Sequence, residues 1–156
     1  MLTVNWEPLT NLLAEGLEDL GACHWEEVEH DKKEVPFALD IASGIAMEKS
    51  GAFRIAALRR DQELVGYCAF IFGSLHAFRT RQAFLDAIYV VPEARGCGAT
   101  FLKKIEALLR AAGVERFVAE IKPEVPLRPG KSRGTVGEFF KACGYEDYAQ
   151  VYSKLL

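Results

Sequence analysis

The sequence predicts an α/β domain in which helices pack against one central sheet, and three observations point to this class. Half of the 156 residues are hydrophobic and 11% are aromatic, which is typical of a chain that buries a core. Stretches with the alternation of a strand are interspersed with stretches that have the period of a helix. Near the middle, a strand-like run passes through glycines directly into an amphipathic helix. We expect one domain, residues 1–156, which buries about 70% of the surface of the unfolded chain.

The N-terminal third is expected to hold a short strand and two helices. Residues 2–5 form the strand, and Pro8 suits the first turn of a helix whose leucines recur at helical spacing. Gly21 ends this helix in our interpretation. The second helix lies within residues 36–49, starts at its proline and ends near Gly51.

A β-hairpin and a further strand are predicted next. Residues 53–59 and 64–72 flank the polar turn Arg-Asp-Gln-Glu, which is a strong hairpin pattern. The second of these strands is apolar on both faces, as a central strand should be. Residues 84–91 form the following strand.

The last third predicts a helix, a strand, a helix and a strand in turn. The first helix spans residues 98–112 and is terminated by Gly113. The strand covers residues 116–121, the next helix residues 136–143, and the last strand residues 145–154.

A glycine-containing turn, Arg95-Gly96-Cys97-Gly98-Ala99-Thr100, separates the middle strand from its helix. The free N–H groups at a helix start form a site for a phosphate. Two alternatives are an ordinary strand-to-helix turn and a Rossmann dinucleotide loop. The Rossmann pattern needs three spaced glycines and an acidic residue about 20 residues further on, early in the fold. This turn lies late and follows an apparent hairpin.

The turn resembles the pyrophosphate-binding signature of the GCN5-related N-acetyltransferases (GNAT), which reads Arg or Gln, two residues, Gly, one residue, and Gly or Ala. Thr100 departs from the last position of that signature. The predicted order of elements is also that of the family. The resemblance implies the GNAT fold, a mostly antiparallel, splayed sheet of about six to seven strands flanked by about four helices. Residues 23–28, 75–79 and 144–155 further resemble a branch common in phages and their bacterial hosts.

The resemblance implies that acetyl-CoA is the donor substrate and that its acetyl group moves directly to a primary amine. The pyrophosphate would rest on the backbone amides of residues 95–100. The pantetheine arm would insert where residues 88–91 separate from residues 118–121. The thioester would lie near Tyr89 and Val90, and Val91 would also contact the cofactor.

Asp86 is the leading catalytic candidate. A lysine-like amine has a pKa of about 10.4, so a base must help to remove its proton at neutral pH. Strand alternation would place Asp86 on the face of Ile88 and Val90, as the base or as the group that orients a histidine. The alternative is a buried carboxylate bound to backbone or to Arg79 or Arg81.

Two histidine-containing segments are further candidates. His76 precedes the same strand in a loop and has a side chain suited to proton transfer, against the alternative of an exposed loop histidine. His24, Glu26 and Glu27 form a cluster that would recognise the acceptor amine, against the alternative of a solvated acidic face. With His30 this cluster lacks the spacing H-E-x-x-H, so we expect no metal.

The general acid is open. Many GNAT members carry a tyrosine four residues before the glycine that corresponds to Gly144, where it protonates the leaving thiolate. Phe140 holds that place and cannot donate a proton, so we retain it only as a cofactor contact. Tyr145 is the candidate acid, with Tyr152, water or no acid as alternatives.

Two other functions remain open. The phenylalanine at position 140 favours a non-catalytic CoA-fold binding or inhibitor module that acts on a host protein, and the His24–His30 cluster would suit a metal-dependent hydrolase.

Composition and charge limit the kinds of binding partner and the cellular location that we expect. The net charge of −3 gives no argument for nucleic acid, and the basic residues of 122–133 fit a solvated loop or a contact to a phosphate. The sequence shows neither a membrane span nor a signal peptide, and four scattered cysteines fit reduced thiols. We therefore expect a cytoplasmic protein, either a monomer or a homodimer.

Overall fold

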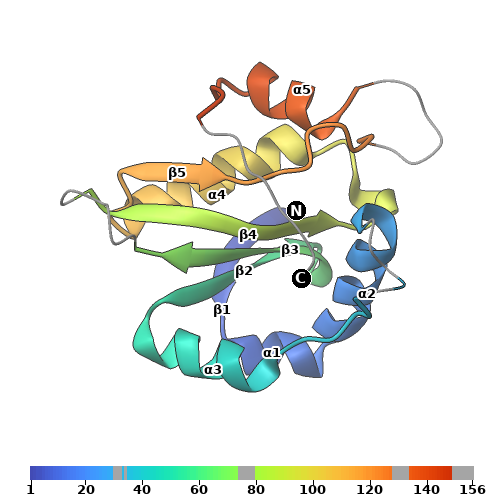
Figure 1. Cartoon of the computed structure of the whole chain (residues 1–156), viewed down its shortest axis with the longest axis vertical. Coiled ribbons are helices and arrows are strands. Elements are labelled where there is room, and N and C mark those ends of the chain that lie inside the picture. Colours follow the sequence, from blue (N-terminus) through green and yellow to red (C-terminus); the bar gives the residue numbers. More distant parts are fainter. Residues whose placement is uncertain (30–32, 34, 74–79, 128–133, 149–156) are drawn as a thin grey trace.

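The structure is a computed structural model that describes residues 1–29, 33, 35–73, 80–127 and 134–148 (Figure 1). Its centre is a five-stranded sheet in which the strands follow one another in chain order. The first four strands pair with one another in antiparallel fashion, and the fourth and fifth strands pair in parallel. The strands are β1 (Leu2–Glu7), β2 (Phe53–Arg60), β3 (Glu63–Phe72), β4 (Gln82–Val90) and β5 (Arg116–Ala119).

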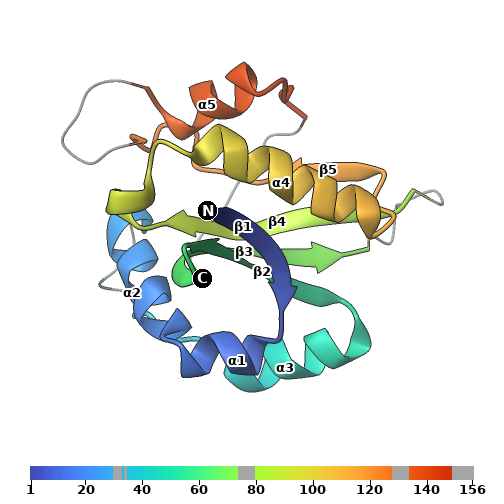
Figure 2. The ribbon, with the colours of Figure 1, turned by 180° about the vertical axis from the view of Figure 1, so that it is seen from behind.

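Helices cover both faces of the sheet (Figures 1 and 2). One face packs against α1 (Leu9–Ala14), α2 (Leu17–Val28) and α3 (Ile41–Ser50). The other packs against α4 (Gly98–Ala111) and α5 (Val136–Ala142). A short 3₁₀ turn, η1 (Pro92–Ala94), leads from β4 toward α4. Among the described residues, no helix has the length and apolar character needed to cross a membrane.

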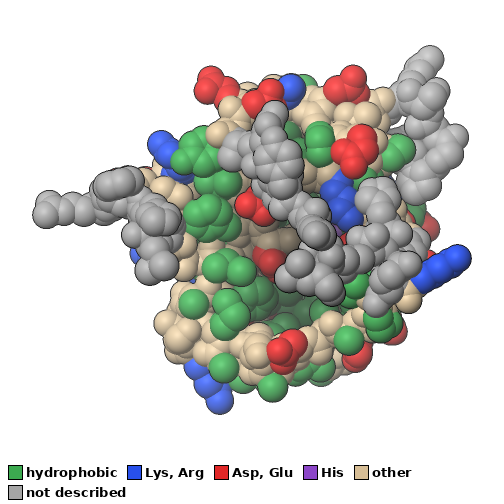
Figure 3. All heavy atoms as spheres, viewed as in Figure 1, with side chains coloured by type: hydrophobic (Ala, Val, Ile, Leu, Met, Phe, Trp, Pro, Cys, Tyr) green, Lys and Arg blue, Asp and Glu red, His purple; other side chains and the backbone are tan. Residues whose placement is uncertain are grey.

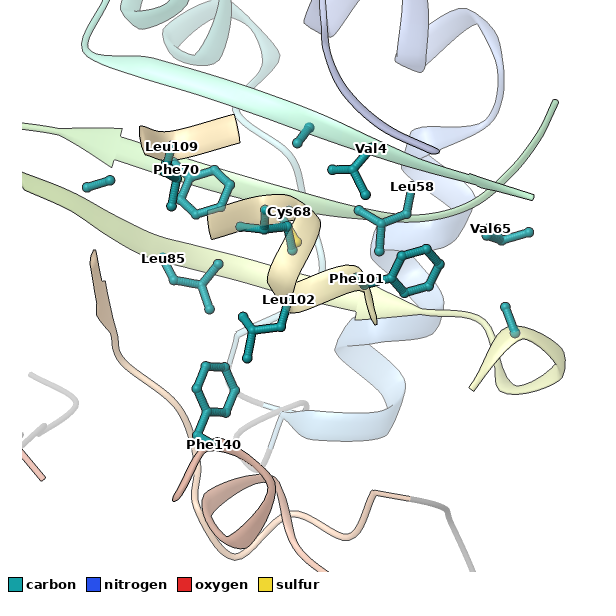
Figure 4. Close-up of a cluster of buried hydrophobic side chains, with 14 residues drawn as sticks. Val4, Leu58, Val65, Cys68, Phe70, Leu85, Phe101, Leu102, Leu109 and Phe140 are labelled. Carbon is teal, nitrogen blue, oxygen red and sulfur yellow. The ribbon is translucent and has the colours of Figure 1, made fainter. Parts of the chain in front are cut away.

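The core between α4 and the sheet fixes where α4 begins. Phe101, Leu102 and Leu109 of α4 and Phe140 of α5 are at most 5% exposed and point toward the strands (Figure 4). Phe70 of β3 belongs to the same cluster and is fully buried. Burying side chains of this size contributes about 1.5–3 kcal/mol each, so the first turn of α4 is held firmly against the sheet.

The predicted hairpin is confirmed, and its turn is tight. Asp61 and Gln62 both have positive φ, 51° and 76°, as a two-residue hairpin connection requires. β3 is buried at Val65 through Phe70, as expected for a central strand.

The predicted N-terminal helix is wrong in its extent. It is two helices, α1 and α2, separated at Gly16, which has a left-handed φ of 96°. Gly21 does not end a helix but lies buried inside α2, where a Cβ would stand 2.9 Å from Cζ of Phe37. α3 begins after Asp40, whose carboxylate accepts a hydrogen bond from the Ser43 amide at 3.0 Å, and not at the proline of the predicted segment.

The C-terminal strand differs from expectation in the part that the structure describes. Residues 145–148 are not in a strand, and the rest of the predicted segment lies outside the described residues. The described part therefore holds five strands and five α-helices, fewer strands and more helices than predicted.

Candidate active site

β4 has an open edge beyond the point where β5 ends. The two strands pair only as far as Leu85 opposite Ala119, whereas β4 continues to Val90. Within the described residues, segment 86–90 has no partner strand on that side, and such an edge offers backbone donors and acceptors to an extended ligand. The opening was expected against residues 118–121, but the pairing at Ala119 places its start at the end of β5.

Asp86 lies in a β-bulge at the start of this open edge. The register between β3 and β4 shifts so that Asp86 is an extra residue between Leu85 and Ala87. A bulge interrupts strand alternation, and accordingly both Leu85 and Ile88 pack into the core beneath α4. The prediction that Asp86 shares the face of Ile88 is therefore wrong. The alternative of a buried carboxylate does not hold either, because Asp86 is exposed. Burial raises the pKa of Tyr67 on β3, and the nearby charge of Asp86 adds to this effect.

The start of α4 presents free backbone amides beside the same edge. α4 begins at Gly98, and no side chain caps it at Cys97. The first helical hydrogen bond runs from the Phe101 amide to the Cys97 carbonyl at 3.0 Å, so the preceding amides have no intrahelical acceptor. Gly96 takes the left-handed φ of 114° that the turn requires. Thr100, the third residue of this helix, is exposed.

The Arg95 side chain is tied to α2 rather than free. Its Nη2 donates to Oε2 of Glu27 at 2.5 Å and its Nε donates to the Val90 carbonyl at 2.9 Å. The guanidinium also lies 5.5 Å from the centroid of the Tyr89 ring. These contacts join the glycine turn, the end of β4 and α2 in one unit.

Lys122, from the basic segment after β5, contacts the C-terminal end of α2. Its Nζ donates to the Val28 carbonyl at 3.0 Å and to Oε1 of Glu29 at 3.2 Å. A cation at a helix C-terminus is favourable for the helix dipole. The remaining basic residues of that segment, Arg128, Lys131 and Arg133, lie outside the described residues.

A cluster of rings lies between α2 and the end of β4. Nδ1 of His24 is 2.9 Å from the Tyr67 hydroxyl, and the His24 ring stacks on Tyr89 with centroids 5.3 Å apart. The Tyr89 hydroxyl donates to Oε1 of Glu27 at 2.9 Å. Burial lowers the pKa of His24, against the opposing charge of Glu27, and burial raises the pKa of both tyrosines. At neutral pH the cluster therefore contains a neutral imidazole and two protonated phenols.

An open strand edge that runs into an uncapped helix start is the arrangement expected for an acetyl-CoA site. The family model described as acetyltransferase (GNAT) family matches residues 9–126. The chain belongs to the GNAT family. It is therefore an acyltransferase of the N-acetyltransferase class, whose donor is acetyl-CoA.

Solved structures of other GNAT proteins share the fold. An aminoglycoside acetyltransferase from an uncultured soil metagenomic sample is 14% identical, with a TM-score of 0.70 over 100% of this chain and 99% of that chain. A ribosomal-protein-alanine N-acetyltransferase from Brucella melitensis biovar Abortus 2308 is 15% identical, with a TM-score of 0.66 over 99% of each chain. Aminoglycoside N-acetyltransferase AAC(6')-Iy in complex with CoA is 17% identical, with a TM-score of 0.68 over 100% and 95%. No curated protein matches this chain significantly.

Tyr145 and Phe140 lie on the α4 side of this GNAT domain. The Tyr145 hydroxyl donates to Oε1 of Glu106 at 3.0 Å, and burial raises its pKa. The Tyr145 ring packs edge-on against Phe140 at 5.1 Å between centroids. Both residues line a cavity of about 1510 Å³ between β5, α4 and α5, whose lining includes neither Asp86 nor any residue of 95–100. The structure thus separates the candidate acid from the candidate base.

The other predicted site residues have mixed outcomes. His76 lies outside the described residues, as does His30. Glu26 is on α2 with His24, and Glu27 is already engaged by Arg95. In the part of the chain that the structure describes, no group of three His, Cys, Asp or Glu side chains is placed to hold a metal.

Tyr67 is the residue that sequence reasoning missed. It reads as one more apolar position of a central strand, and no spacing in the sequence connects it with His24, which lies 43 residues away.

Proposed function

We propose that this GNAT protein is a single-domain enzyme that transfers the acetyl group of acetyl-CoA directly to a primary amine. The observation that carries the proposal is the open edge of β4 leading into the uncapped start of α4. The edge offers hydrogen bonds to the extended pantetheine arm, and the helix start offers amides and a positive dipole end to the pyrophosphate.

The donor side uses the residues of the turn and the open edge. The pyrophosphate binds at residues 95–100, and the pantetheine lies along residues 86–91 with the thioester near Tyr89 and Val90. Phe140 supports this side from the core beneath α4, where it is 5% exposed. The absence of a side-chain cap at Cys97 fits this assignment, because a bound phosphate accepts the hydrogen bonds that a cap would otherwise accept.

The acceptor side is the face that carries α2 and the bulge. A protonated amine is attracted to the exposed carboxylate of Asp86, which we assign as the group that binds the ammonium and assists its deprotonation. Glu26 and His24 border this side from α2. Figure 3 shows that the corresponding face of the molecule is hollowed below its centre, where apolar and acidic side chains meet.

The acceptor is a primary amine, and turnover assays with different amines will identify its chemical class. The names of three structurally similar acetyltransferases specify different acceptors: aminoglycosides, a ribosomal-protein alanine and glucosamine-6-phosphate. These three amines form the first panel to test with this protein.

The free cysteines Cys23, Cys68, Cys97 and Cys143 fit a reducing compartment.

Acetyl-CoA should raise the melting temperature of the protein, and Gly98→Val should abolish that rise. A Cβ at Gly98 already stands 3.3 Å from Cζ of Phe139, so the larger valine side chain crowds that ring and shifts the first turn of α4. Ala111→Val, an exposed β-branched change at the other end of α4, is the matched control and keeps the rise. Equal acetyl-CoA affinity of Gly98→Val and the parent would refute the location of the donor site.

Thiol release from acetyl-CoA with the amine panel tests the transfer. Asp86→Asn should lower turnover by about 100-fold while leaving the dissociation constant of acetyl-CoA nearly unchanged. Binding of acetyl-CoA without turnover of any amine would instead favour a non-catalytic CoA-binding module, the alternative that Phe140 suggested.

A further inference from the structure

We propose that Tyr67 and His24 form a proton relay for the acceptor amine, in which the Tyr67 hydroxyl takes a proton from the ammonium while passing its own proton to Nδ1 of His24. This inference rests on the proposed function and names the path by which that site removes the proton. It uses two residues from elements far apart in the chain, β3 and α2.

The relay is located at the thioester end of the open edge. Tyr67 is opposite Tyr89 in the pairing of β3 with β4, and their rings lie 6.4 Å apart on the α2 side of the sheet. The His24 ring covers Tyr89 at an interplanar angle of 23°. The hydroxyl of Tyr67 therefore lies beside the strand segment where the acetyl group is expected, on the side from which the amine approaches.

The hydrogen bond between the two residues has the length that a relay needs. Nδ1 of His24 and the Tyr67 hydroxyl are 2.9 Å apart, and both groups are largely buried. A phenol in such a place remains protonated at neutral pH, since burial raises its pKa, and so it has a proton to pass on. The neutral imidazole next to it has a lone pair to receive that proton.

Charged groups around His24 support the protonated intermediate. Glu27 is one turn along α2, and its negative charge favours the imidazolium, while burial and two cations oppose it. The groups that face the imidazole are Glu27 on α2, Tyr67 on β3, Tyr89 on β4, Arg95 in the turn and Lys122 after β5. His24 therefore accepts a proton transiently and releases it readily, as a relay partner must.

The chemical step balances as follows. The ammonium loses one proton to the Tyr67 oxygen, and the Tyr67 proton moves to His24. The free amine forms a C–N bond with the thioester carbonyl carbon, the C–S bond breaks, and the surplus proton on nitrogen passes to the departing thiolate. The imidazolium then releases its proton to solvent, which leaves amide, CoA thiol and one proton.

Two variants and two controls test the relay with an amine that the parent turns over. His24→Asn keeps a polar atom near the Nδ1 position but cannot take a proton, and Tyr67→Phe removes the hydroxyl. Each should lower kcat by about 100-fold at pH 7 with acetyl-CoA affinity within about threefold of the parent. The controls are Cys23→Ala, an exposed neighbour on α2, and Tyr148→Phe, which removes an exposed phenol bonded to Arg116. Both controls should keep parental turnover.

The pH profile separates a relay from a structural role. Parental kcat/KM should fall on acidification through the lowered pKa of His24 and be flat above it. In both variants it should rise about tenfold per pH unit toward the amine pKa of about 10.4, because only amine that is already deprotonated then reacts. A parental profile in the variants, or turnover within about threefold of the parent, would overturn the relay and leave the proposed function standing.

Nitrogen NMR of the histidine ring gives a test that needs no acceptor. At pH 7.5 Nδ1 of His24 should be unprotonated and Nε2 protonated, because the relay requires Nδ1 to accept from Tyr67. A protonated Nδ1 would exclude the relay. Absence of turnover by the parent with every amine, despite acetyl-CoA binding, would remove the proposed function and the relay together.

Discussion

Replacing Thr100 by Glu should weaken acetyl-CoA binding without weakening the fold. Thr100 is the third residue of α4 and is exposed, so Glu there meets the positive end of the helix dipole and favours the free protein by about 0.3–1 kcal/mol. The same carboxylate would stand roughly 6 Å from a phosphate bound at the helix start. At an effective dielectric constant of about 20, that repulsion is about 3 kcal/mol. Screening at an exposed position reduces it to about 1.5–2 kcal/mol, or about 10- to 30-fold in Kd.

Isothermal calorimetry and thermal unfolding, run on the same samples, measure the two effects. Thr100→Gln has nearly the same shape without the charge and should bind acetyl-CoA within about threefold of the parent. Ser43→Glu is the matched charge control, because Ser43 is the exposed third residue of α3. It should leave the affinity unchanged. Parental affinity in Thr100→Glu would refute the placement of the phosphate at the start of α4, as would a loss of equal size in Ser43→Glu.

Three further predictions concern the fold around the site. Gly66→Ala should destabilise the protein by about 1–3 kcal/mol in denaturant titrations and weaken acetyl-CoA binding. The reason is that a Cβ at this position would lie 2.3 Å from the Tyr89 carbonyl oxygen. Parental stability of the variant would show that β3 and β4 separate freely. Acetyl-CoA should protect Cys97 from a thiol reagent, whereas the exposed Cys23 should react at the same rate with and without acetyl-CoA. If Cys97 also reacts at the same rate with and without acetyl-CoA, the turn is not the donor site. The contribution of Asp40 to stability should be present above its unfolded pKa and be lost as pH falls through the lower folded value, since its hydrogen bonds at the start of α3 lower its pKa; acid unfolding of Asp40→Asn that matches the parent would contradict this.

Much of the fold could be predicted because its signals are local. The hairpin shows in a polar turn between two apolar runs, and the helix after the glycine turn shows in its apolar period. The prediction of a single N-terminal helix failed because it also relied on a local signal. Gly21 looks like a terminator in sequence, but the Phe37 ring that packs over it selects glycine for lack of space. A local pattern does not reveal which of these two reasons put a glycine there.

The candidate site was predictable on the donor side and much less so on the acceptor side. The turn from Arg95 to Thr100 is contiguous, so its residues and their spacing are readable in the chain. Asp86 was found by its unusual polarity, but its orientation depends on the register with β3, and one extra residue in the pairing reverses the face of every side chain.

By itself, the sequence determined the strand, turn and helix of the proposed donor site, because short-range periodicity and glycine positions specify them. The tertiary structure decided the rest. It placed Asp86 in a bulge, joined Glu27 to Arg95 across 68 residues, and brought His24 to Tyr67 across 43 residues. These contacts depend on how helices and strands pack against each other, and packing is set by the whole chain rather than by any local segment.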